Sequence, residues 1–89
     1  MNDLIAKKIL EKIEKSEEVL ETKEILEELQ ISLTRLTRTK VFSRLNNLRG
    51  EGLIKGKFVG PGKGVWIWWK KNAFFEKNFD GKNEVENGE

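Results

Sequence analysis

The sequence has 89 residues and a mass of 10.4 kDa, with 17 basic and 15 acidic side chains and a formal net charge of +2. This length suits one small domain. Without Cys there is no disulfide or thiolate-bound metal, and without His the commonest general base and metal ligand is missing. We therefore expect no enzymatic activity, no metal site and no cofactor.

The longest wholly apolar run, residues 65–69, is far shorter than the roughly 20 residues that a membrane helix needs. The N-terminus carries charges where a signal peptide would be apolar. These features predict an intracellular protein, cytoplasmic and nucleoid-associated, that does not enter a membrane.

The charges are segregated along the chain. Residues 1–34 carry five basic and nine acidic side chains, and residues 78–89 carry one basic and four acidic. Residues 35–77 carry eleven basic and two acidic, a net of +9. A basic block of this kind indicates binding to a polyanion, whereas charges placed only for solubility would not be segregated.

The first predicted helix runs from Leu4 to about Lys15, with Asn2 or Asp3 as its N-cap. Its polar face is rich in lysine. Such a helix can lie on a membrane surface, but packing in a protein core with a solvated lysine face is the favoured interpretation. Residues 17–21 are too few for a helix and predict an extended segment or a small strand.

Thr22 is the expected N-cap of a second helix, with Glu24 in its first turn. The apolar residues of this helix recur at helical spacing, and they are Ile25, Leu26 and Leu29. Its exposed glutamates could recruit a partner, although a solvated face is the simpler interpretation.

Two starts compete for the third helix. A start at Ser32 would place Leu36 about 140° from Val41, away from the apolar stripe. With Thr37 as N-cap, the stripe keeps three apolar residues within about 60°, and they are Val41, Leu45 and Leu48. We prefer this start, with residues 31–36 as an apolar turn that enters the core. Gly50 and Gly52 are expected to end the helix.

Residues 53–59 and 65–71 are rich in β-branched and aromatic residues and predict a hairpin. Pro61 and Gly62 suit the centre of a type II turn, because proline fixes φ and glycine accepts positive φ. The intervening "GPGKG" is not a phosphate-binding loop, because Gly64 follows Lys63 where Ser or Thr is needed, and no helix follows.

Alternation in the second strand places Trp66 and Trp68 on one face and Trp69 on the other. One face must therefore find cover outside the main core. Phe75 and Phe79, four residues apart in a predicted last helix, could cover it or meet another subunit. A stacking platform for single-stranded nucleic acid is a sharper hypothesis, but core or interface packing is favoured over it.

The segment "ETKEILEELQIS" resembles the second helix and turn of a helix-turn-helix, and "TRTKVFSRLNNLRGEGLIKGKFVGPGKGVWIWW" resembles the recognition helix and wing of winged-helix DNA-binding domains. The family pattern is a polar cap, apolar residues four, eight and eleven positions later, and Gly-Leu-Ile opening the wing. Here these positions are Thr37, Val41, Leu45, Leu48 and Gly52 to Ile54. The family turn passes directly from an Ile-Ser pair into the recognition helix, whereas this chain inserts residues 33–36 and one further residue.

The resemblance implies an α+β winged helix-turn-helix, with a three-helix core and a C-terminal β-hairpin wing over residues 1–79. Residues 80–89 are expected to be a disordered polar tail. The implied function is sequence-specific binding of double-stranded DNA by a transcriptional regulator. Helix 37–49 would enter the major groove, and wing 53–71 would lie on the backbone or minor groove. The composition also resembles small regulators of archaea and their viruses or plasmids. The alternative is a protein-interaction module that uses the aromatic hairpin.

The residues expected to bind DNA lie in the turn, the helix and the wing, and they are Arg35, Arg38, Thr39, Lys40, Ser43, Asn46, Asn47, Lys55, Lys57 and Lys63. Thr39, Ser43 and Asn46 are expected to contact base edges or nearby phosphates, and the others position the duplex. Arg44 and Arg49 are expected only to pair with glutamates of the first helix. A homodimer is expected through the aromatic residues of the second strand and C-terminal segment, which are Trp66, Trp68, Phe74, Phe75 and Phe79.

Overall fold

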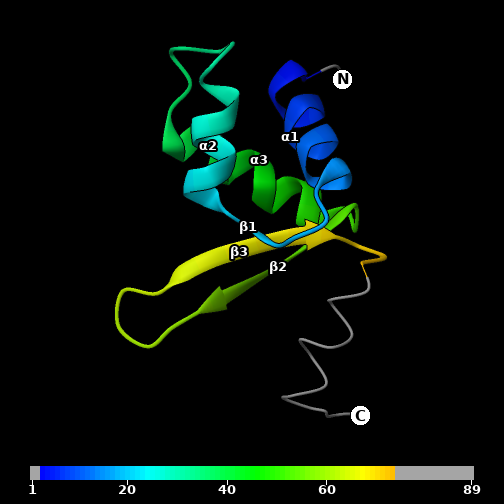
Figure 1. The fold of residues 1–89 in the computed structure, drawn as a ribbon, viewed down its shortest axis with the longest axis vertical. Coiled ribbons are helices and arrows are strands. Elements are labelled where there is room, and N and C mark those ends of the chain that lie inside the picture. The colour runs from blue at the N-terminus through cyan, green and yellow to red at the C-terminus, as the bar shows by residue number, and fades with distance from the viewer. Residues whose placement is uncertain (1–2, 74–89) are drawn as a thin grey trace.

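The computed structural model describes residues 3–73, and within them three helices pack against a three-stranded antiparallel sheet (Figure 1). In chain order the elements are α1 (Leu4–Lys15), β1 (Leu20–Glu21), α2 (Thr22–Leu29), α3 (Arg38–Gly50), β2 (Ile54–Val59) and β3 (Val65–Lys70). The strand order is β1-β3-β2, so β3 is central. The α+β class expected from the sequence is confirmed.

Helix α1 begins where the sequence predicted. The Asp3 carboxylate accepts hydrogen bonds from the backbone N–H groups of Ile5 (3.0 Å) and Ala6 (3.2 Å), so Asp3 is the N-cap. Ile9 and Ile13 are fully buried on the inner side of the helix. The predicted extended segment after α1 contains the two-residue strand β1.

Helix α2 begins one residue earlier than expected. Thr22 is its first helical residue and Glu21 is the N-cap, so the expectation that Thr22 caps the helix is wrong. The Glu24 carboxylate accepts a 2.7 Å hydrogen bond from the Glu21 N–H, which satisfies one donor at this end. The Thr22 hydroxyl instead accepts a hydrogen bond from the Trp68 indole on β3.

Helix α3 confirms the start at Thr37, whose hydroxyl accepts a 3.2 Å hydrogen bond from the Lys40 N–H. The alternative start at Ser32 is wrong. In the preceding turn Leu36 is buried in the core, as expected, but Ile31 is 76% exposed. Ile31 lies two residues after the end of α2, and the turn aims it at solvent before the chain returns to the core at Leu36.

The end of α3 is fixed by backbone hydrogen bonds. The Leu53 N–H donates to the Leu48 carbonyl and the Gly52 N–H donates to the Arg49 carbonyl, both at 3.0 Å. This Schellman arrangement requires the positive φ of 79° that Gly52 adopts. Gly52 therefore ends the helix, whereas Gly50, also expected to stop it, is still helical.

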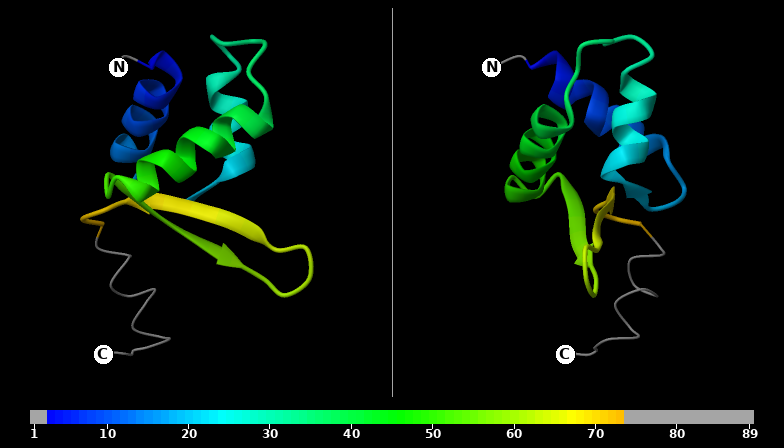
Figure 2. Two further views of the ribbon diagram at one scale, coloured as in Figure 1. Left: turned by 180° about the vertical axis from the view of Figure 1, so that it is seen from behind. Right: turned by 90° about the vertical axis from the view of Figure 1, so that its left-hand side faces the viewer.

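The predicted hairpin is present, with Ile54 opposite Lys70 at its base and Val59 opposite Val65 at its end. The turn residues are Gly62 and Lys63, one position later than the Pro61–Gly62 centre expected for a type II turn. The positive φ expected at Gly62 is observed, at 70°. Figure 2 shows that this end of the hairpin projects away from the three helices.

Both faces of β3 are buried, by different sets of residues. Trp68 is fully buried in the main core with Ile54, on the face toward the helices. Ile67 and Trp69 lie on the other face in a smaller cluster with Ala73, against which Val19 packs. The expectation that one face is covered outside the main core is therefore confirmed.

Candidate nucleic-acid interface

Helix α3 has one buried and one exposed side. Val41, Leu45 and Leu48 are buried against α1, α2 and the sheet. At 100° per residue, Thr39, Ser43 and Asn46 lie within about 60° of one another on the opposite side. Thr39 and Ser43 are exposed and Asn46 is half-buried. We call these three residues the polar face of α3. It carries hydroxyl and amide groups that can donate and accept hydrogen bonds.

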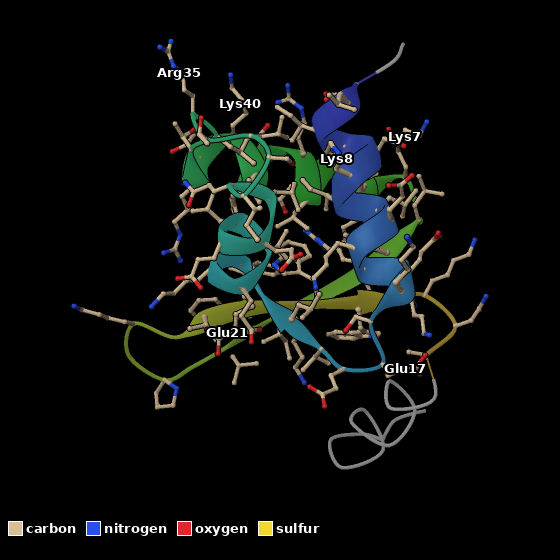
Figure 3. All side chains as sticks on the ribbon, turned by 45° about the horizontal axis from the view of Figure 1, so that its top comes forward. Lys7, Lys8, Glu17, Glu21, Arg35 and Lys40 are labelled. Carbon is tan, nitrogen blue, oxygen red and sulfur yellow. The ribbon has the colours of Figure 1, made fainter. Side chains whose placement is uncertain are left out.

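Two cations flank the N-terminal end of α3. Arg35 from the preceding turn and Lys40 from the first turn of α3 project at the same end of the molecule (Figure 3). Both line one shallow hollow whose apolar walls are Ile5, Leu33 and Leu36. Arg38 is also exposed on this first turn. The N-terminal end of α3 therefore presents three exposed cations, which favour an anionic ligand.

On the side of α3 that faces α1, Arg44 is held in an ion pair within the protein. The Arg44 guanidinium donates to the Asp3 carboxylate, whereas a pairing with glutamates of the first helix had been expected. The hydrogen bond from the Ala6 N–H, followed by that from Arg44, lowers the pKa of the Asp3 carboxyl below its ordinary value. Asn47 lines the same hollow between α1 and α3, to one side of the polar face.

Arg49 is the residue that sequence reasoning missed. Its guanidinium carbon lies 5.2 Å from the centroid of the Trp66 ring, a cation–π contact between α3 and the hairpin. Its Nη2 also donates a long 3.5 Å hydrogen bond to Asn46 Oδ1. The expected pairing of Arg49 with glutamates of the first helix is wrong, and Arg49 instead connects the polar face of α3 to the hairpin.

The three lysines expected in the wing do not lie together. Lys55 and Lys57 alternate with Ile54, which is in the core, so they lie on the sheet face turned away from α3. Lys63 is exposed in the turn of the hairpin. Of the three, Lys63 is therefore the one that does not lie on the sheet face turned away from α3.

A row of aromatic rings lies on the sheet face toward the helices. Trp66 and Trp68 stack at 5.2 Å with an interplanar angle of 19°, and Phe42 of α3 meets both rings edge-on at 6.0 and 5.9 Å. Phe58 of β2 meets Trp66 edge-on at 6.1 Å. Exposure rises along the row, from none at Trp68 to 49% at Phe58.

The burial of this row contradicts one of the residues expected at the dimer interface. Trp68 is fully buried within its own chain, so it offers no surface to a second copy. Gly56 lies directly opposite Trp68 and leaves room for its ring, which explains how so large a side chain enters the core. Trp66 is half-buried. The other residues expected at a dimer interface, Phe74, Phe75 and Phe79, lie outside the described residues.

The electrostatic balance of this part of the molecule is strongly positive. Residues 35–73 carry ten basic side chains and one acidic one. Within residues 3–73, no group of three or more acidic side chains could hold a metal ion. No helix in that part of the chain is long and apolar enough to cross a membrane.

Three solved structures resemble this fold. A HOP2 structure, described by its DNA recognition and protein interaction domains, has a TM-score of 0.61 and 24% identity over 74% of this chain and 97% of that chain. A zinc-bound PerR structure from GAS has a TM-score of 0.65 and 18% identity over 75% and 43%. Bacillus subtilis PadR in complex with operator DNA has a TM-score of 0.62 and 14% identity over 97% and 50%.

This chain thus spans half or less of the PerR and PadR chains and nearly all of the HOP2 chain. A comparison with protein-family models finds no match, and neither does a comparison with curated proteins. The structural likeness defines a winged-helix fold, as the sequence resemblance implied. In this fold α3 is the third helix of the core, and the β2–β3 hairpin is the wing.

Proposed function

We propose that this protein binds double-stranded DNA in a sequence-specific manner and acts as a transcriptional regulator by occupying an operator. The observation that carries the proposal is the polar face of α3, which is solvent-accessible and bordered by Arg35, Arg38 and Lys40. A major groove about 12 Å wide admits one helix that presents hydrogen-bonding groups to base edges. The likeness to PadR, a protein solved with operator DNA, supports this choice.

The proposal assigns roles by position. Thr39, Ser43 and Asn46 contact base edges, while Arg35, Arg38, Lys40 and Asn47 contact phosphates beside the groove. Lys63 contacts phosphates near the wing. Lys55 and Lys57 face away from α3, so the proposal gives them no contact in the groove that α3 enters. No chemical step is involved, because binding alone excludes other proteins from the site.

We further propose that residues 1–79 form the binding domain and that two copies act together. One recognition helix and wing bury only roughly 600–1,000 Å² of protein surface on DNA, so useful specificity calls for a pair. With Trp68 in the core and the half-buried Trp66 covered by Arg49, the proposed contact rests on Phe74, Phe75 and Phe79. Sedimentation equilibrium of the full chain tests it, and a mass of 10.4 kDa at all concentrations would contradict it.

A gel-shift titration against genomic duplex fragments at several salt concentrations tests DNA binding. If about five basic side chains reach phosphates per subunit, the logarithm of the affinity falls against the logarithm of salt with a slope of about −4 to −5. A preference among fragments at fixed salt shows sequence specificity. A flat salt response would contradict the proposal and favour a protein-interaction module.

A further inference from the structure

The free end of the wing is unusually apolar for an exposed hairpin. Phe58 is 49% exposed, Val59 37% and Val65 38%. They account for half of the six large hydrophobic side chains that are exposed within residues 3–73. Phe58, opposite Trp66, lies on the sheet face toward the helices, whereas Val59 and Val65 lie opposite one another on the other face, so the three surround the end of the hairpin. We call these three residues the wing tip.

The Phe58 ring is held in place. A Cβ atom added at Gly64 would lie 2.5 Å from the ring, and one added at Gly60 would lie 3.2 Å from it, so the ring rests directly on both glycines. Trp66 supports the ring edge-on from its own strand. An exposed ring that is already ordered loses little conformational freedom when it binds.

The wing tip is continuous with the polar face of α3. Asn46 contacts Arg49, Arg49 lies over Trp66, and Trp66 contacts Phe58. Alternation places Phe58 on the sheet face toward the helices. A ligand that covers the polar face of α3 and extends along the hairpin therefore meets the wing tip next.

The charge around the wing tip selects its ligand. Residues 57–65, which contain the wing tip, carry two lysines, Lys57 and Lys63, and no acidic residue. Two copies that paired symmetrically through this surface would bring Lys63 of one chain close to Lys63 of the other, and like charges repel. A polyanion with an apolar interior fits instead, because its phosphates can meet Lys63 while its stacked bases meet the ring of Phe58.

We propose that the wing tip is an apolar wedge that enters the minor groove of the bound duplex and partly unstacks one base step, with Phe58 as the inserted side chain. This inference rests on the proposed DNA-binding function. Side chains such as Phe and Leu act in this way when a flanking cationic surface holds the backbone, and the duplex kinks at the inserted step. The wedge gives specificity for deformable steps without a base-edge hydrogen bond.

The experiment compares the affinity of the full chain for two duplexes of one sequence at low salt. One duplex is fully paired and the other carries a single unpaired adenine, where stacking is already weakened. A wedge that no longer has to open the stack binds the second duplex about tenfold more tightly. Phe58→Ala removes this preference, Phe58→Leu retains most of it, and Ile31→Ala, which truncates an exposed apolar residue outside the wing, leaves it unchanged.

Thermal unfolding of each variant accompanies the binding assay, so that a lost preference is not confused with a lost fold. Equal affinity of the wild-type protein for both duplexes, or a preference that survives Phe58→Ala, would overturn the wedge but not DNA binding. No binding to either duplex would overturn both. A wild-type dimer without DNA that Phe58→Ala dissociates would identify the wing tip as a contact between copies and overturn the wedge.

Discussion

The indole nitrogen of Trp68 donates a 2.9 Å hydrogen bond to the hydroxyl of Thr22, and both side chains are buried. The contact joins the first residue of α2 to the central strand of the sheet, 46 residues apart in sequence. It satisfies a polar atom in the middle of the core. It therefore fixes where α2 begins relative to β3.

Thr22→Val is expected to destabilise the protein by about 1–3 kcal/mol, because the shape is kept while a buried indole N–H loses its acceptor. Thr22→Ser retains a hydroxyl and is the matched control, with a smaller loss. Urea unfolding followed by tryptophan fluorescence measures both. A Thr22→Val protein as stable as wild type would show that the hydrogen bond contributes nothing net.

Gly56→Ala is expected to destabilise the protein by about 1–3 kcal/mol or more, because overpacking a tight contact forces neighbouring groups to move. The added Cβ would lie 2.4 Å from the Trp68 ring. Gly50→Ala is the control, since nothing lies within 4 Å of its Cβ position and Gly50 is helical. That change is expected to stabilise by roughly 0.5 kcal/mol. Equal effects of the two changes in thermal unfolding would contradict the packing argument.

Asp3→Asn is expected to reduce stability at neutral pH and to have little effect in strong acid. The folded-state pKa of Asp3 is lowered from 3.8, so the ionised carboxylate stabilises the fold above that value. This contribution is lost as the pH falls through the lowered value. Asparagine also caps helices well, so the difference reports the charge rather than the cap. Unfolding measured across pH tests this, and parallel curves for both proteins would refute it.

Asn46→Ala and Lys63→Ala are expected to act differently on DNA binding. Asn46→Ala changes the preference at one base position by about 1–3 kcal/mol, whereas Lys63→Ala weakens all sequences alike and makes the salt slope less steep by about 1. Lys23→Ala, an exposed lysine of α2 outside the proposed interface, is the control and leaves both quantities unchanged. The same uniform loss from Asn46→Ala and Lys63→Ala would show that the polar face of α3 does not read sequence.

The helix starts at Asp3 and Thr37 could be predicted, because a cap depends only on a short polar side chain and the stripe that follows it. The exposure of Ile31 could not, since it depends on how the turn after α2 folds back toward the core. The preference of threonine for N-cap positions also gave a wrong prediction at Thr22. Its hydroxyl instead accepts the hydrogen bond from Trp68.

In the candidate site, the polar face of α3 followed from helical spacing, but the position of Arg49 did not. Arg49 lies at the border of the apolar stripe, and only the packing of the hairpin beside α3 shows that its partner is Trp66. The alternation along β3 placed Trp66 and Trp68 on one face, but it did not predict how deeply each side chain is buried. Gly56 was the available signal, because a glycine inside a strand marks a close approach, here by the ring of Trp68.

The Schellman hydrogen bonds at Gly52 leave only residues 51–53 between α3 and β2. A joint so short and so fully bonded gives the helix and the wing little freedom to swing separately. If both contact one duplex, as proposed, the distance between the two contacts along the DNA is nearly fixed. A DNA site whose groove spacing differs from that distance must bend or twist to make both contacts. Because the energy of this deformation depends on sequence, selection extends to base pairs that no side chain touches.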